Sequence, residues 1–238
     1  MPIDILVTVL ATTVIQSIFG VGVLLFGTPV LLLLGYDFIN ALSVLLPISI
    51  AINLLQIIKH YQHIDISFCK RVLIYSIPFV IVFLFLVSTA IINISLLVGG
   101  FLILVALKSI FPVIEQKLET MFKHERVYLA LMGLIHGLTN LGGSLLTAIV
   151  HSKNQDKNTT RVTIATCYAT FAFFQLITLF LMGSQFELSY SDNMSFLQIG
   201  VIVFLLTEEI IYSNINNKKY NQFFALFLLL SGLLLIVK

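Results

Sequence analysis

Long stretches without a single charged or histidine residue are the feature of this sequence that most limits what it can fold into. One of them extends from Val72 to Leu107. An apolar helix of about 20 residues spans the roughly 30 Å hydrocarbon core of a bilayer. Dividing the apolar stretches by this length predicts eight helical segments, at residues 5–34, 38–58, 72–90, 94–112, 127–150, 162–183, 194–212 and 220–237.

The composition excludes several other classes of protein. Apolar residues make up 59% of the chain and charged residues only 10%, too few to keep the helices of a soluble bundle in water. A net charge of +2 gives no basic field that would attract nucleic acid. Cys69 and Cys167 are far apart in sequence and outside any CxxC pattern, which argues against a thiolate metal site. The sequence therefore predicts an all-α polytopic membrane protein that meets the lipid bilayer on its outer surface.

Segments 5–34 and 127–150 share a pattern, because small and polar residues interrupt both near their middles. The first contains Gln16-Ser-Ile-Phe-Gly-Val-Gly22, and the second contains His136-Gly-Leu-Thr-Asn-Leu-Gly-Gly-Ser144 at the matching place. Repeated units in transporters place the substrate where the two halves meet, near the membrane midplane. We therefore predict two four-segment repeats and a cytoplasmic loop between them, with boundaries at 1–115, 116–126 and 127–238.

The positive charges indicate how the segments cross the membrane. If all eight segments cross, these charges fall on both sides, against the bias that gathers Lys and Arg in the cytoplasm. If segments 5–34 and 127–150 are re-entrant hairpins, nearly all of the charges share one side, and the halves are inverted. We prefer this interpretation to eight plain crossings. It predicts a protein of the cell (inner) membrane with both termini outside the cytoplasm. The charges that then share a side are Lys59, Lys70, Arg71, Lys108, Lys117, Lys123, Arg126, Lys153, Lys157, Arg161, Lys218 and Lys219.

The glycines in the two interrupted segments predict broken helices. A helix that restarts at membrane depth presents unpaired N–H groups and its positive dipole end, which together form an anion site without a formal charge. Ser144, directly after the second interruption, is a candidate cap for such a restart. The alternative is that the glycines only allow neighbouring helices to pack closely.

His136 is the ionisable residue that lies inside a predicted span and well away from its ends. Such groups are rare in membranes and usually functional, so it would hold a proton or donate to an anion. The alternative is a neutral histidine that is hydrogen-bonded within the protein. The predicted substrate-binding residues are thus Gln16, Gly20, Gly22, His136, Asn140, Gly142, Gly143 and Ser144.

Other polar residues are candidates for a transport pathway or for proton coupling. Those inside spans are explained either by interhelical hydrogen bonds or by a polar pathway. Arg161 is interpreted first as a topogenic charge and otherwise as an oxoanion clamp. Glu208 and Glu209 are interpreted as a solvated helix end, with proton coupling by one of them as the alternative. The pathway or coupling candidates are Asn53, Gln56, Arg161, Thr166, Gln175 and Glu208.

No HExxH, GxSxG or Walker motif occurs, so the sequence predicts neither an enzyme nor a resident metal or cofactor. An intramembrane acid–base enzyme built on His136 is the less favoured alternative. A non-transporting assembly or scaffold protein is another alternative, and it would tolerate changes at the glycines.

Three short motifs resemble the TauE/SafE family of sulfite and organosulfonate exporters. Gln16–Gly22 followed by Gly27-Thr28-Pro29 is similar to the family's first half-motif, and Gly133–Ser144 is similar to the second. Thr159–Thr166 resembles the start of the helix that follows. Among the departures, Val23 and Leu24 stand where glycine is usual, Asn140 occupies a glycine position, and His136 adds polarity.

The resemblance implies a secondary transporter that exports a small anion, such as sulfite or an organosulfonate, by a proton or potential gradient. This expectation agrees with the anion site that broken helix ends would create. Alternating access would come from one half moving against the other.

Overall fold

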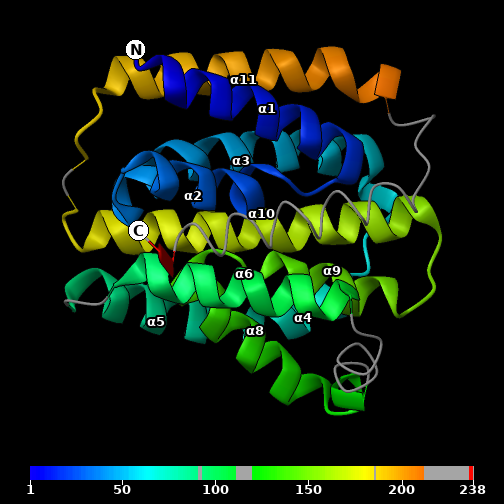
Figure 1. The fold of residues 1–238 in the computed structure, drawn as a ribbon. Coiled ribbons are helices and arrows are strands. Elements are labelled where there is room, and N and C mark those ends of the chain that lie inside the picture. The colour runs from blue at the N-terminus through cyan, green and yellow to red at the C-terminus, as the bar shows by residue number, and fades with distance from the viewer. Residues whose placement is uncertain (91–92, 111–119, 185, 212–235, 238) are drawn as a thin grey trace.

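The structure is a computed structural model that describes residues 1–90, 93–110, 120–184, 186–211 and 236–237. Every regular element in these ranges is helical, which confirms the all-α prediction (Figure 1). The predicted segment 220–237 lies mostly outside the described residues, and so do residues 116–119 of the predicted loop 116–126. The helices of the first half are α1 (Ile3–Phe19), α2 (Val23–Leu34), α3 (Phe38–His60), the 3₁₀ turn η1 (Tyr61–His63), α4 (Ile66–Tyr75), α5 (Ile77–Thr89) and α6 (Ile94–Ile110). Those of the second half are α8 (Glu125–Thr139), α9 (Gly143–His151), α10 (Lys157–Leu181) and α11 (Tyr190–Ile211).

Four helical stretches among the described residues are long and apolar enough to cross a membrane: Phe38–His63, Ile66–Thr89, Lys157–Leu181 and Tyr190–Glu208. Shorter apolar helices occur at Ile3–Ser17, Val23–Leu34 and Ile94–Leu107. The large apolar side chains exposed on α5 and α11 suit a lipid-facing surface, and they include Val82, Phe85, Ile202 and Leu205.

Two helices begin earlier than the charge-free stretches suggest, because aspartates cap them. The Asp65 carboxylate accepts from the Phe68 N–H and starts α4, so Lys70 and Arg71 lie inside a helix rather than before it. The Asp156 carboxylate likewise accepts from the first N–H groups of α10. A capping carboxylate satisfies N–H groups that the helix itself leaves unpaired.

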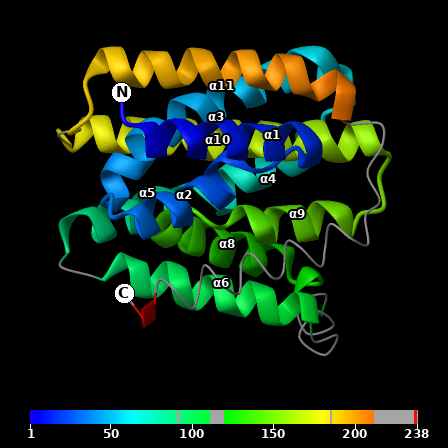
Figure 2. The same ribbon diagram turned by 45° about the horizontal axis from the view of Figure 1, so that its top comes forward.

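Helices from one half of the chain pack against helices from the other half. Helix α3 packs along its counterpart α10 at the centre of the molecule, while α1 packs on α11 and α8 packs on α5. The views in Figures 1 and 2 agree that α1 and α11 lie side by side. The first helix of each half thus packs on the helix that corresponds to the third predicted segment of the other half.

Polar contacts define one end of the helix bundle. The ammonium group of Met1 lies 3.3 Å from the Asp192 carboxylate at the start of α11. The Tyr36 hydroxyl, directly after α2, donates to Asp4 in the first turn of α1 at 2.9 Å. Burial and the neighbouring Asp4 carboxylate raise the pKa of this hydroxyl above its ordinary value. The start of α1 and the end of α2 therefore meet at one end of the bundle.

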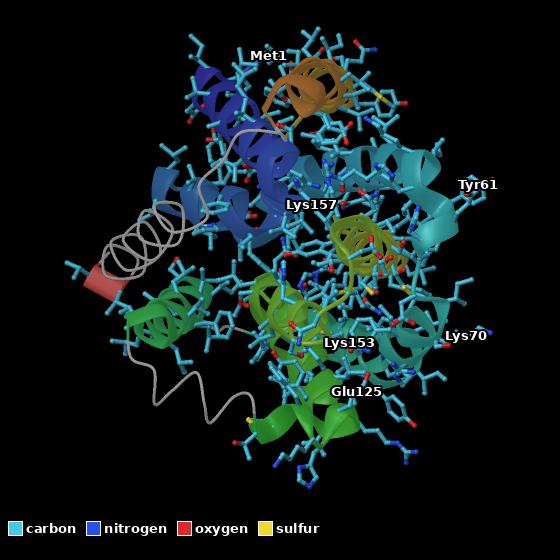
Figure 3. The ribbon with its side chains drawn as sticks, turned by 90° about the vertical axis from the view of Figure 1, so that its right-hand side faces the viewer. Met1, Tyr61, Lys70, Glu125, Lys153 and Lys157 are labelled. Carbon is cyan, nitrogen blue, oxygen red and sulfur yellow. The ribbon has the colours of Figure 1, made fainter. Side chains whose placement is uncertain are left out.

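Ion pairs define the opposite end, which Figure 3 views along the helices. Arg71, in the middle of α4, donates to Glu125, at the start of α8, at 2.9 Å. Lys153, directly after α9, lies 3.8 Å from Asp65. Hairpin α8–α9 therefore opens at the end opposite to the one at which hairpin α1–α2 opens.

The Asp65 carboxylate is surrounded by hydrogen-bond donors and positive charges at the end of the bundle that holds Arg71 and Lys153. Burial alone would raise the pKa of its carboxyl group. The Phe68 N–H, the Gln155 amide and the positive charges of Lys153 and Arg71 outweigh burial and hold that pKa below its ordinary value. The carboxylate thus joins the start of α4 to the connection between α9 and α10.

Candidate functional site

The first helix break is a sharp reversal between α1 and α2. Gly20 adopts the left-handed conformation with φ 73°, and its N–H bonds the Gln16 carbonyl at 2.8 Å, which ends α1. A Cβ at Gly22 would lie 2.6 Å from the Gln16 backbone nitrogen and 2.8 Å from the Thr12 carbonyl oxygen. Only glycine therefore permits the start of α2 to come this close to α1.

The side chain of Gln16 occupies this break. Its carbonyl oxygen accepts from the Val23 N–H at 2.8 Å, in the first turn of α2. Its amide nitrogen donates to Asn53 on α3 at 3.2 Å, and Asn53 donates to the Ser49 hydroxyl at 3.1 Å. All of these side chains are buried. Gln16 thus links α2 to α3, and it satisfies one of the N–H groups that the first turn of α2 leaves unpaired.

At the second break the first helix ends in the same way as at the first break. Asn140 adopts the left-handed conformation with φ 61°, and its N–H bonds the His136 carbonyl at 2.8 Å. Asparagine tolerates this conformation better than other residues with a side chain, which explains its place at a glycine position. A Cβ at Gly142 would lie 2.5 Å from the His136 Cβ, so this glycine is also required by close approach.

Ser144 does not cap the restart. Its hydroxyl donates to the Leu141 carbonyl at 3.1 Å, and no side chain caps α9. Instead, the Tyr168 hydroxyl of α10 occupies the space that a side chain on Gly143 would need.

His136 points into the packed interior of the second half. Its Nε2 lies 3.1 Å from the Gln175 side-chain oxygen, and its ring lies against Phe171 with centroids 4.5 Å apart. Because a carbonyl oxygen only accepts, Nε2 carries the hydrogen and Nδ1 carries the lone pair. His136 is fully buried.

The two halves touch directly at this break. The amide nitrogen of Asn140 donates to the Thr28 hydroxyl of α2 at 2.8 Å, and both residues are fully buried. The second break therefore lies against the helix that restarts after the first break.

A buried ion-pair cluster lies beside the first break. Arg161 Nη2 is 3.0 Å from Glu208 Oε1 and 3.4 Å from the Ser17 carbonyl oxygen near the end of α1. The Arg161 side chain also packs under Gly20, where a Cβ would lie 3.3 Å from its Cγ. Lys59 approaches the other Glu208 oxygen at 3.8 Å.

The interpretation of Glu208 as a solvated helix end is therefore wrong for its side chain, and Arg161, interpreted first as a topogenic charge, has a buried side chain that pairs with it. Each is only 7% exposed. The charged and polar residues near Arg161 and Glu208 in the sequence suggested helix ends. They did not indicate that α10 and α11 bring the two side chains together. The side chain of Glu209 lies outside the described part of the structure.

The comparisons with known proteins agree with this architecture. Residues 5–235 match the family model described as Sulfite exporter TauE/SafE. The chain belongs to the TauE/SafE family. The comparisons with curated proteins and with solved structures gave no match. Membership of a transporter family of this type places the chain among sulfite and anion exporters and in a membrane, as the sequence motifs led us to expect.

The TauE/SafE motifs coincide with the two breaks, and the remaining polar candidates are dispersed around them. Gln175 bonds His136, and Asn53 bonds Gln16, as described above. Gln56 is buried on α3 without a hydrogen bond to the described residues. The Thr166 hydroxyl donates back to the Val162 carbonyl within α10.

Sequence reasoning missed Ser49 and Tyr168, and it named Thr28 only as part of a family motif. Polar residues inside long apolar helices are common, and nothing local distinguishes Ser49 or Tyr168. A comparison of the two halves would have identified Ser49 and Tyr168 as corresponding positions. Ser49 lies as far from the capping residue Asp37 of α3 as Tyr168 lies from the capping residue Asp156 of α10.

Proposed function

We propose that this chain is a secondary carrier that exports a small anion, such as sulfite or an organosulfonate, by alternating access, with the anion bound at the helix breaks. The observation that carries this proposal is the pair of broken helices, which enter the bundle from opposite ends and have buried breaks. Irregular backbone at membrane depth is tolerated where it is buried in protein or lines a polar path.

The two halves, 1–115 and 127–238, are in this proposal inverted repeats. Support comes from the exchanged packing of α1 on α11 and α8 on α5, and from the opposite openings of the two hairpins. A pseudo-twofold relation of this kind gives a carrier two similar conformations that open to opposite sides.

The end of the bundle that holds Lys70, Arg71 and Lys153 is in this proposal cytoplasmic, by the positive-inside bias. The Met1 end then lies outside the cytoplasm. Labelling of single introduced cysteines in intact cells checks this orientation, because a membrane-impermeant reagent would reach a cysteine at position 2 and not one at position 70.

The anion would approach the breaks past Gln16, Asn140 and the glycines, in a site with no resident cofactor. Glu208, held by two cations, and His136 are the proposed proton-coupling groups. Exchange of a carboxylate between cation-paired and protonated states is a means of coupling proton movement to anion movement.

The test is uptake of radiolabelled sulfite into proteoliposomes with and without an imposed pH gradient. Gly142→Leu should abolish flux, because its side chain would collide with His136 at the second break. The matched control is Gly100→Leu, since a Cβ at Gly100 meets nothing within 4 Å. Full flux in the Gly142 variant would remove the breaks from the transport mechanism.

Folding is checked in the same samples by gel filtration and thermal melting. Absence of flux in the unmodified protein for sulfite and for a panel of sulfonates would refute the proposed function.

A further inference from the structure

At both breaks a residue in the left-handed conformation ends the first helix, but the breaks differ in how their polar groups are satisfied. At the first break, both polar atoms of the Gln16 side chain and both of Asn53 make hydrogen bonds. The series runs without interruption from the Val23 N–H to the Ser49 hydroxyl. The first break is therefore closed by the protein's own groups.

The second break leaves buried polar atoms unpaired. Within the described part of the chain, His136 Nδ1, Asn140 Oδ1 and Gln175 Nε2 have no hydrogen-bond partner, although all three residues are fully buried. The backbone N–H groups of Gly142 and Gly143 also make no hydrogen bond to these described residues. A buried polar atom without a partner costs free energy, so such a group calls for a ligand that satisfies it.

Tyr168 completes the surroundings of this break. Its hydroxyl lies against Gly143 at the first turn of α9, and its ring faces the His136 ring with centroids 6.4 Å apart. The corresponding residue in the first half is Ser49, which the Gln16–Asn53 series already uses. The second half thus places an additional hydroxyl where the first half has a closed series of hydrogen bonds.

The polar groups at the second break include both hydrogen-bond donors and hydrogen-bond acceptors. The Gln175 amide, the Tyr168 hydroxyl and the two glycine N–H groups donate, whereas His136 Nδ1 and Asn140 Oδ1 accept. A ligand that satisfies both kinds has several acceptor oxygens and at least one hydrogen to donate. The helix dipole supplies only about half a positive charge, which suits a monoanion better than a dianion.

We propose that the second break alone forms the anion site, and that it takes a protonated monoanion, hydrogen sulfite rather than the sulfite dianion. This inference rests on the proposed function and specifies its ligand. The donors bind the sulfite oxygens, and His136 Nδ1 accepts the hydrogen that the anion carries. At the first break the Gln16 carbonyl oxygen already occupies the position that an anion oxygen would take.

The pH dependence of binding then follows the ligand, because few groups at the site titrate. The side chains placed against His136 are Tyr168, Phe171 and Gln175 from α10. Helix α5 approaches the adjacent residue Gly137 with Phe83 and Leu84. Tyr168 is the side chain among these that carries a titratable group.

The experiment is equilibrium binding of radiolabelled sulfite to the purified full chain in lipid nanodiscs at pH 6 and pH 8. Apparent affinity for total sulfite should fall as the pH rises, in proportion to the hydrogen sulfite fraction. Sulfate, a dianion at both pH values, should not compete. These measurements use the unmodified protein and do not depend on the folding of any variant.

Variants locate the site. Tyr168→Phe should weaken binding about tenfold, the usual effect of removing a hydrogen bond to a charged ligand. His136→Gln should abolish binding, because a glutamine there would cover the α9 terminus as Gln16 covers that of α2. Ser49→Ala, the matched change in the first half, should leave affinity within about twofold, since it touches no donor at the second break.

Equal losses in the Ser49 and Tyr168 variants would overturn the assignment to one break. Affinity that is constant or rises between pH 6 and pH 8 would overturn the assignment of the protonated form. In either case, continued sulfite flux by the unmodified protein would leave the proposed function in place, whereas absent flux would refute both.

Discussion

Loss of the Arg161–Glu208 ion pair should destabilise the protein far more than loss of a comparable pair at the surface. The Arg161→Met variant leaves Glu208 buried at 7% exposure, with Lys59 at 3.8 Å as its remaining cation. It also removes the group that contacts the Ser17 carbonyl at the end of α1. Breaking a buried pair by removing one partner typically costs about 3–5 kcal/mol. At about 2–4 °C per kcal/mol for a chain of this size, the melting temperature should fall by about 10 °C.

The assay is thermal unfolding in detergent, followed with a dye that becomes fluorescent on reaction with thiols. The chain contains no tryptophan, and its buried Cys167 reports unfolding as it becomes accessible. Arg71→Met is the matched control, because Arg71 pairs with Glu125 at 2.9 Å while both side chains are about one-third exposed. Such exposed pairs contribute about 0–1 kcal/mol, so this variant should shift the melting temperature by about 3 °C at most.

A further variant separates the charge effect from the packing effect. Arg161→Met combined with Glu208→Met removes both charges and should recover most of the lost stability, because apolar replacements of buried pairs are often neutral. The reasoning would be refuted if Arg161→Met melted no earlier than Arg71→Met. It would also be refuted if the double variant were less stable than the single one.

Three further predictions follow from contacts elsewhere in the fold. Gly133→Leu should destabilise the protein by about 2 kcal/mol or more in the same melting assay, because a side chain there would enter the Ser76 backbone where α8 crosses α5; an unchanged melt would contradict this packing. The depressed pKa of Asp65 means that its carboxylate stabilises the fold above the unfolded-state pKa, and that this contribution is lost as pH falls through the folded-state pKa; Asp65→Asn should therefore flatten the acid side of the stability profile, and an unaltered profile would count against it. The Cys69 and Cys167 sulfur atoms lie 3.8 Å apart, so mild oxidation with copper phenanthroline should join α4 to α10, as peptide mass spectrometry would show, and intermolecular products alone would disprove their proximity.

Much of the architecture could be predicted from the sequence because lipid imposes simple rules. Apolar length identified the long helices, and small residues such as Gly20 and Gly142 marked where the other helices break. The ends were less accurate, since the absence of charge was used as a boundary. Lys70 and Arg71 lie within α4 because Asp65 starts that helix before them.

The candidate site was predictable only in part, because side-chain pairing depends on which helices become neighbours. His136 was identifiable as an ionisable group at membrane depth, but its partner Gln175 was not assigned to it from the sequence. The pairing of Arg161 with Glu208 needs α10 and α11 to meet near the tip of α1, which no local pattern encodes. Tyr168 resembles any other aromatic residue of an apolar helix until Gly143 is placed beneath its hydroxyl.

The exchanged packing of the two halves has a consequence for how the chain is made. Helix α1 packs mainly on α11, which begins only at Tyr190 and is made long after α1. At ordinary rates of translation, α1 waits on the order of ten seconds or more for that partner to emerge. Its inward face carries Thr12, Thr13 and Gln16, which lipid solvates poorly. The first hairpin must therefore be sheltered by the insertion machinery, or remain at the membrane surface, until the second half arrives to receive it.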